Sequence, residues 1–225
     1  MPVKDSILTT EEAIRAIVDS GYSVSVFDDF SKEETADRLD ALAEETGIRV
    51  VHLKDLTDHP SPNYRLVLLT ARKEALEKGQ HLVIVESDVV VSPDTLDRML
   101  AEVKPGTGLV AAVTHDAAGQ INFPYDYARK LQGQTVETRK RLSFCCTLLT
   151  EELLRSFDFG RLDPEKNWYD VFISHEAVRL GFRNLLMLDS PVVHKPHSSR
   201  PWKQLKYSNP IKYYLMKLLH GRDKI

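Results

Sequence analysis

The sequence has few cysteines and little net charge. Only two cysteines occur among 225 residues, side by side at Cys145 and Cys146, and neighbouring thiols make a poor disulfide framework. We therefore expect a reducing compartment. Thirty basic and 33 acidic side chains leave a net charge of −3. That balance argues against a nucleic-acid-binding protein whose affinity depends on basic charge.

Long apolar runs are also absent. None approaches the roughly 18 residues of a membrane span, and the opening residues MPVKDSILTTEE have no apolar signal-peptide core. Hydrophobic residues make up 42% and charged residues 28%, which is typical of soluble globular proteins. The length favours one large domain, residues 1–225, over two. We therefore expect a soluble, cytoplasmic, single-domain protein.

Short β-branched runs alternate with helical segments through the first two thirds of the chain. The runs typical of buried parallel strands are VSVF (24–27), VVHL (50–53), LVIV (82–85) and LVAAV (109–113). Helix-start patterns lie at Thr9, Ser31 and Ser92. This repeating order predicts an α/β fold with a mostly parallel central sheet and helices on both faces.

The alternation breaks near residue 115, and residues 115–141 show no clear period. Beyond them come further predicted elements: strands at 143–149 and 185–188, a short helix from Thr150 and a helix over about 168–180. The chain thus divides into a nucleotide-type half, residues 1–114, and a more variable half, residues 115–225.

Acidic side chains stand where three predicted strands end. Asp28 and Asp29 follow VSVF, Glu86 and Asp88 follow LVIV, and Asp5 closes the first segment. Ligands of open parallel sheets bind outside the carboxyl ends of the strands. A turn or a helix cap accounts for any single acid as well. Several carboxylates at one edge repel one another unless a cation compensates, and such ligands suit Mg²⁺ or Mn²⁺.

Five segments, taken in order, resemble the family 2 glycosyltransferases with the GT-A fold. They are PVKDS (2–6), like the family's Pro-x-x-Asn/Asp segment; VFDDFSKEET (26–35), like its Asp-Asp-x-Ser nucleotide-binding turn; VIVESDVVVSPDTL (83–96), like its Asp-x-Asp metal motif; NWYDVFISHEAVRLGF (167–182), with the spacing of its Glu-Asp motif; and VVH (192–194), like its Val-x-His. Together they cover nearly the whole chain.

The resemblance implies a GT-A-like fold, with a Rossmann-like nucleotide half and a variable acceptor half. It implies an inverting glycosyltransferase, of the kind used in polysaccharide biosynthesis, that moves a sugar from a nucleotide-diphosphate donor to an acceptor hydroxyl with Mn²⁺ or Mg²⁺. The implied roles are donor binding for Asp5, Asp28, Asp29 and Asp88, metal binding for Asp88, Glu86 and His194, and catalytic base for Asp170. A loop histidine and a solvated first-turn acid are the alternatives for His194 and Asp170.

Three positions depart from the family pattern. Glu86 stands where the family has Asp, which keeps the charge and lengthens the reach. Tyr169 replaces the Glu of the Glu-Asp motif and leaves Asp170 as the only acid there. The family also has an apolar strand directly before its Pro-x-x-Asn segment, whereas this sequence begins Met1-Pro2. Either upstream residues are missing, or that strand is reduced to two or three residues.

Two other functions stay open. A nucleotidyltransferase that makes sugar nucleotides would carry a glycine-rich, arginine-containing loop after the first strand, and this sequence has none. A catalytically degenerate relative that acts as a binding subunit agrees with Tyr169 and the short first strand. The presence of Asp88, Asp170 and His194 together opposes it.

The expected partners are a nucleotide-diphosphate sugar donor and a saccharide or lipid-linked acceptor, with no nucleic acid. Arg200 is a candidate to close on the diphosphate, with a solvated basic loop as the competing interpretation. Residues 210–222 read as an amphipathic basic helix. Packing against the domain and peripheral attachment to the inner face of an anionic membrane are the two interpretations of that helix.

Overall fold

The computed structural model describes residues 1–166, 168–195, 209, 212, 214 and 215. Arg200 and most of residues 210–222, for which the sequence predicts a diphosphate contact and an amphipathic helix, lie outside the described residues. The chain divides into one unit over Met1–Lys195 and a second over Pro196–Ile225, and all elements below belong to the first. None of the described helices combines the length and the apolar character that crossing a membrane requires.

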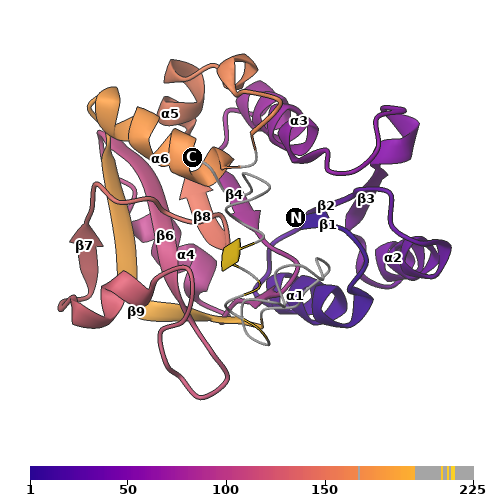
Figure 1. The fold of residues 1–225 in the computed structure, drawn as a ribbon, viewed down its shortest axis with the longest axis horizontal. Coiled ribbons are helices and arrows are strands. Elements are labelled where there is room, and N and C mark those ends of the chain that lie inside the picture. Colours follow the sequence, from indigo (N-terminus) through magenta and orange to yellow (C-terminus); the bar gives the residue numbers. More distant parts are fainter. Residues whose placement is uncertain (167, 196–208, 210–211, 213, 216–225) are drawn as a thin grey trace. The chain divides into compact units, whose positions relative to one another are not determined.

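Helices and strands alternate along the first half of the chain, as the sequence predicts (Figure 1). The helices are α1 Ile7–Asp19, α2 Glu33–Thr46, α3 Tyr64–Glu77, α4 Thr95–Ala101, α5 Glu151–Ser156 and α6 Tyr169–Arg179, with the 3-10 helices η1 Leu53–Asp55, η2 Asp126–Lys130 and η3 Phe159–Arg161. The strands are β1 Pro2–Val3, β2 Ser25–Asp28, β3 Arg49–His52, β4 Leu82–Val85, β5 Val89–Val90, β6 Thr107–His115, β7 Thr135–Glu137, β8 Cys146–Leu149 and β9 Arg183–His194.

The strands form two sheets. The first, ordered β1-β2-β3, is parallel throughout. The second is ordered β4-β8-β6-β9-β5, with β7 also paired to β9, and β6 with β9 is its only parallel pairing among the described strands.

The α/β class is therefore confirmed, but the mostly parallel central sheet is not. The prediction assumed that an α-helical crossover follows every strand, since parallel neighbours need one. The chain between β6 and β8 holds only η2 and β7 instead. As a result β8 returns antiparallel between β4 and β6.

The long strand β6 forms the centre of the core. Only His115, its last residue, is not fully buried, and its side chains alternate between two apolar clusters. Val110 packs into the cluster that includes side chains of α1, α2 and α4, whereas Leu109 packs into the cluster that includes side chains of α3, α5 and α6. Helices therefore cover both faces of the sheet, which explains why this strand reads as a continuous apolar run.

The first residues of the helices were predicted less accurately than the strands. Thr9 was predicted to cap the first helix, but it lies inside α1 and its hydroxyl donates to the Ser6 carbonyl at 3.1 Å. Thr150 is a true cap, because its hydroxyl accepts the backbone N–H of Leu153 at 3.3 Å. The pattern of a Ser or Thr followed three residues later by an acid also occurs inside helices. It therefore predicts that a helix is present more reliably than it predicts the residue at which the helix begins.

The amino group of Met1 is buried at the start of β1. Its nitrogen donates to the Ser25 carbonyl at 2.8 Å, and the Met1 carbonyl accepts from the Phe27 N–H at 2.8 Å. Burial lowers the pKa of this amino group from 8.0 to about 5. In the given sequence β1 is therefore preceded by a buried, hydrogen-bonded nitrogen.

This buried amine predicts a pH dependence of stability. Between about pH 5 and 8 the unfolded chain holds a proton on Met1 that the folded chain lacks. The free energy of unfolding therefore rises with pH across this window, and this stabilisation is lost as the pH falls. The shift corresponds to about 4 kcal/mol. Urea unfolding from pH 5 to 8.5 measures it, on protein released from a fusion with a free Met1 amine.

The matched control is the same protein acetylated at the Met1 nitrogen, which keeps every other titratable group. We expect its stability to fall less steeply below pH 8. Superimposable profiles for the two proteins would show that the amine stays protonated in the folded state.

Candidate functional site

Four side chains with metal-binding atoms meet where strands of the larger sheet begin and end. Glu86 follows β4, Asp88 precedes β5, Cys145 precedes β8 and His194 ends β9. The donor atoms of Glu86, Cys145 and His194 all lie within 4.8 Å of one another. Asp88 joins them, with its Oδ2 3.5 Å from His194 Nε2. The structure therefore brings together all three predicted metal ligands and one residue that was not predicted.

Strand pairing brings these four residues together. β4 pairs with β8 antiparallel, and Glu86 donates its N–H to the Cys145 carbonyl at 3.0 Å just past that ladder. A tight turn follows, in which the Val89 N–H bonds the Glu86 carbonyl at 3.2 Å. β5 then pairs antiparallel with the end of β9, so that Val89 lies opposite His194. The turn thus holds both acids against the last residue of β9.

Hydrogen bonding orients the imidazole of His194. Its Nδ1 lies 2.9 Å from the Phe123 carbonyl, which can only accept, so Nδ1 carries a proton. This leaves Nε2 facing Asp88. A backbone carbonyl behind one ring nitrogen, with the other nitrogen aimed at acids, is the arrangement that orients metal-binding histidines.

The charges of the cluster perturb one another. Burial raises the pKa of Glu86, and the neighbouring Asp88 carboxylate raises it further. Burial lowers the pKa of His194, but Asp88 and Glu86 outweigh that effect and raise it overall. Burial, followed by Glu86, holds the pKa of the Cys145 thiol well above its usual value. Such a cluster retains protons that a divalent cation would displace.

Asp170, the predicted base, lies beside this cluster. It stands in the first turn of α6 and is half-buried, with its Oδ2 3.7 Å from the Arg141 guanidinium. Its charge is among those that raise the pKa of Glu86 and of Tyr64, so Asp170 lies close enough to interact with both groups. The helix N-terminus and Arg141 both place positive charge beside its carboxylate.

Three residues near the site were not predicted from the sequence. Tyr64, at the start of α3, has a buried hydroxyl that makes no hydrogen bond within the described chain, and burial, then Glu86, holds its pKa well above the usual value. Arg141 stacks over the Phe123 ring at 5.5 Å, next to Asp170. Cys145 donates its thiol to Glu86 at 3.2 Å. Of these three residues, only Cys145 could have been identified from the sequence, because its thiol is a group that can bind metals.

Asp28 lies at the end of β2, as predicted, and is tied to its own chain. Its Oδ2 bonds His52 Nδ1 at 2.8 Å and its Oδ1 accepts the Ser31 N–H at 3.1 Å. His52 also bonds Asp40 at 3.0 Å. Burial lowers the pKa of His52, but the two carboxylates outweigh burial and raise it overall.

Asp29 and Asp5 also hold loops in place. Asp29 accepts the Ser61 hydroxyl at 2.7 Å and two N–H groups of Asn63 at 2.8 and 2.9 Å, which fastens the end of β2 to the start of α3. Asp5 accepts the Lys32 N–H at 2.9 Å. These acids form a second group, distinct in its contacts from the metal-type cluster, and their nucleotide-binding role stays a prediction.

The sequence profile of glycosyl transferase family 2 matches residues 1–176. The chain belongs to this family. The match includes every predicted site residue except His194 and Arg200, and it confirms the predicted resemblance to the family. No curated protein matches the chain in sequence.

Solved family-like structures confirm the GT-A fold. The Pyrobaculum calidifontis mannosyltransferase PcManGT, with GDP-Man and Mn²⁺, superposes with a TM-score of 0.65 at 17% identity over 100% of this chain. S. aureus TarS 1–349 with UDP-GlcNAc gives 0.61 at 15% over 88%. GalNAc-T7 with UDP, GalNAc and Mn²⁺ gives 0.54 at 15% over 79%. The chain spans 63%, 58% and 38% of those three chains.

The Asp28–His52 contact generates a prediction. In Asp28→Asn the pKa of His52 should fall, because burial remains while the buried carboxylate partner is lost. Asp40→Asn is the matched control, and it should lower that pKa less because the Asp40 side chain is 61% exposed. An NMR titration of the His52 ring measures both. Equal shifts in the two variants would mean that Asp28 is not the dominant partner.

Proposed function

We propose that this protein is an inverting, metal-assisted glycosyltransferase that moves a sugar from a nucleotide-diphosphate donor to an acceptor hydroxyl. The observation that carries the proposal is the convergence of Glu86, Asp88 and His194 beside Asp170 in a family 2 chain. Three structural relatives hold GDP-Man, UDP-GlcNAc or UDP with GalNAc. They support the donor class and leave the nucleotide base open.

The donor set of the cluster fits a divalent ion. Asp88, Glu86 and His194 would hold it, with Cys145 as a fourth donor. A bound ion supplies Lewis acidity to the diphosphate leaving group. Imidazole is a poor ligand for Mg²⁺, which takes oxygen, so we propose Mn²⁺ over Mg²⁺. Two of the structural relatives contain Mn²⁺.

The chain's own residues would place the donor. The group at the end of β2, with Asp28, Asp29 and Asp5, would accept hydrogen bonds from the base or the ribose. The buried Tyr64 hydroxyl would donate to the bound substrate, because it makes no hydrogen bond within the described chain. A buried hydroxyl without a partner is costly, and a ligand oxygen would remove that cost.

Asp170 would take the proton of the acceptor hydroxyl as that oxygen attacks the anomeric carbon. Attack on the face opposite the diphosphate inverts the configuration in a single displacement, which needs no protein nucleophile. Arg141 and the helix N-terminus would place positive charge beside this carboxylate. The acceptor, a saccharide or a lipid-linked molecule, would bind beside Asp170.

The other two functions that the sequence left open fit less well. The family match disfavours a nucleotidyltransferase. A degenerate binding subunit would have no need for three potential metal-ligand atoms within 4.8 Å of one another. The assembled cluster therefore favours an active enzyme.

The metal assignment predicts the behaviour of Asp88→Ala. Removing this carboxylate should weaken Mn²⁺ binding at least about tenfold, because each carboxylate ligand supplies charge that a hard ion requires. Electron paramagnetic resonance of free Mn²⁺ measures binding without substrate. Asp37→Ala, which removes an exposed acid of α2, is the control and should bind as the wild type does. Equal affinities in the two variants would place the ion elsewhere.

The base assignment predicts the behaviour of Asp170→Asn. Asn keeps the shape and removes the basicity, and loss of a general base costs about 10²–10⁴-fold in rate. We therefore expect donor affinity within a few-fold of the wild type and turnover at least about a hundredfold lower. Release of nucleoside diphosphate from the donor, with acceptor or by hydrolysis, is the assay. Turnover at the wild-type rate would mean that another group is the base.

A further inference from the structure

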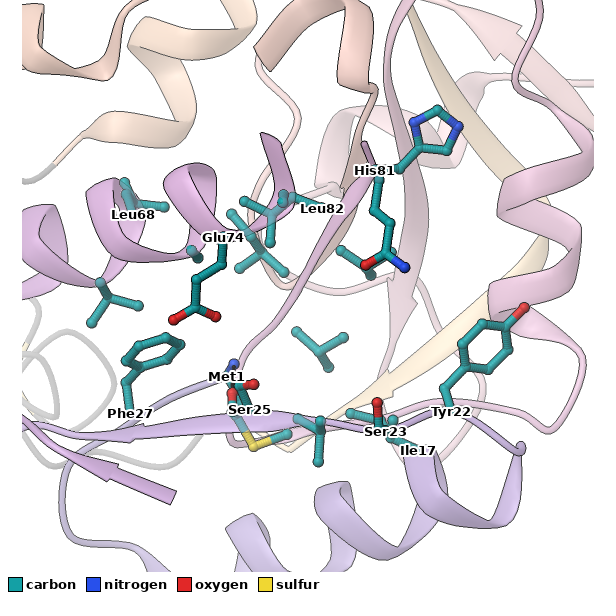
Figure 2. A pocket seen from close by; sticks show the side chains of 18 of the residues that line it. Met1, Ile17, Tyr22, Ser23, Ser25, Phe27, Leu68, Glu74, His81 and Leu82 are labelled. Carbon is teal, nitrogen blue, oxygen red and sulfur yellow. Dashed lines mark hydrogen bonds between the residues drawn. The ribbon is translucent and has the colours of Figure 1, made fainter. Parts of the chain in front are cut away.

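The cluster that follows β4 stands apart from the other ionisable side chains. Among the residues that the structure describes, Glu86, Cys145 and His194 are the one set of three placed to hold a metal ion. A cavity of about 660 Å³ offers a contrast. Figure 2 shows Glu74 and His81 in its lining, with the imidazole turned away from the carboxylate. Both already have partners, since Glu74 pairs with an arginine and His81 accepts a backbone N–H.

The donor atoms of the cluster are of three chemical types. Asp88 and Glu86 offer oxygen, His194 offers nitrogen and Cys145 offers sulfur. Carboxylate oxygen suits Mg²⁺ and Mn²⁺, whereas a thiolate selects softer ions. Zn²⁺ accepts all three types of donor, and sites of mixed donors generally bind it more tightly than Mn²⁺. The sulfur therefore extends the range of ions that the site can hold.

The spacing of the donors fits a tetrahedral ion. The Cys145 Sγ lies 3.2 Å from Glu86 Oε2, and His194 Nε2 lies 3.5 Å from Asp88 Oδ2. Bonds of about 2.0–2.3 Å to Zn²⁺ place the donors of a tetrahedron roughly 3.3–3.6 Å apart. The donors of Glu86, Cys145 and His194 lie within 4.8 Å of one another. A small inward movement of these side chains would therefore complete a tetrahedral shell.

The two neighbouring cysteines have different surroundings. Cys145 donates its thiol to Glu86, and its carbonyl accepts the Glu86 N–H at 3.0 Å. The Cys146 Sγ lies 3.7 Å from the sulfur of Met99 and is fully buried. Successive side chains of an extended chain point to opposite faces, which explains the difference. Cys145 is thus placed beside the other donors, and Cys146 supplies a control of the same chemistry.

We propose that Asp88, Glu86, His194 and Cys145 form a Zn²⁺ site in which the cysteine binds as a thiolate, and that Zn²⁺ held there blocks donor binding. The thiol loses its proton to solvent as the sulfur bonds the ion. Four protein ligands fill the tetrahedral shell and leave no position for a diphosphate oxygen. Mn²⁺ takes about six ligands, so the same side chains leave positions open on it. The blocking step rests on the proposed function, whereas the zinc site does not.

Cobalt tests the role of the thiolate, because Co²⁺ takes the place of Zn²⁺ and absorbs light. Metal-free protein loaded with Co²⁺ should show a sulfur-to-cobalt charge-transfer band in the near ultraviolet. Cys145→Ala should lack this band, and the matched control Cys146→Ala should keep it. The ratio of Zn²⁺ to Mn²⁺ affinity, measured by competition with a chromophoric chelator, should fall at least about tenfold in Cys145→Ala. In Cys146→Ala it should stay within a few-fold of the wild type.

X-ray absorption at the zinc edge tests the same site in the wild-type protein, without any substitution. The spectrum should contain one sulfur neighbour at about 2.3 Å, with nitrogen and oxygen neighbours at about 2.0–2.2 Å. Zinc without a sulfur neighbour would overturn the proposed site. A charge-transfer band that survives in Cys145→Ala would overturn it as well.

Calorimetry tests the blocking step. A nucleoside diphosphate that binds the wild-type protein in Mn²⁺ should lose at least about tenfold in affinity when one equivalent of Zn²⁺ is added. Unchanged affinity would overturn the blocking step. Absence of binding in Mn²⁺ would contradict the proposed function and the blocking step with it, while the sulfur measurements would still decide whether the zinc site exists.

Discussion

The turn from Glu86 to Val89 is the constraint on which the candidate site depends. It closes with a single backbone hydrogen bond and sends β5 antiparallel along the end of β9. That pairing brings His194 to Asp88 across more than a hundred residues of chain. On the other side of the turn, the pairing of β4 with β8 sets Cys145 against Glu86. Backbone ladders, rather than the acids themselves, therefore hold the charges together.

Holding those charges together is costly without a cation. The Asp88 carboxylate adds to burial in raising the pKa of Glu86, and both carboxylates raise the pKa of His194 against the effect of burial. Asp28 and Asp29 differ, because donors of the chain itself already neutralise them in part through His52 and Asn63. One group of acids thus has internal hydrogen-bond partners, and the other has a donor set that suits a divalent ion.

The sequence predicts those features that local pattern determines. LVIV gives β4 with its bounds unchanged, and LVAAV lies within β6, because a strand buried on both faces must be apolar throughout. The acids after those strands could likewise be read as a ligand edge. The direction of β8 could not be predicted from the sequence. It depends on the absence of a crossover helix in a segment that shows no periodicity. Tyr64 and Arg141 were missed for the same reason, as their places depend on packing between distant elements.

The link between Asp88, Asp170 and His194 came from the family resemblance, and the fold places the three side chains in one region. Titration of a panel of nucleoside diphosphates into the wild-type protein, by calorimetry in Mn²⁺ and again in EDTA, tests that central claim most directly. One nucleotide should bind with a stoichiometry of one in Mn²⁺ and lose at least about tenfold in affinity in EDTA. Equal affinity with and without the ion, or no binding in either buffer, would contradict the account.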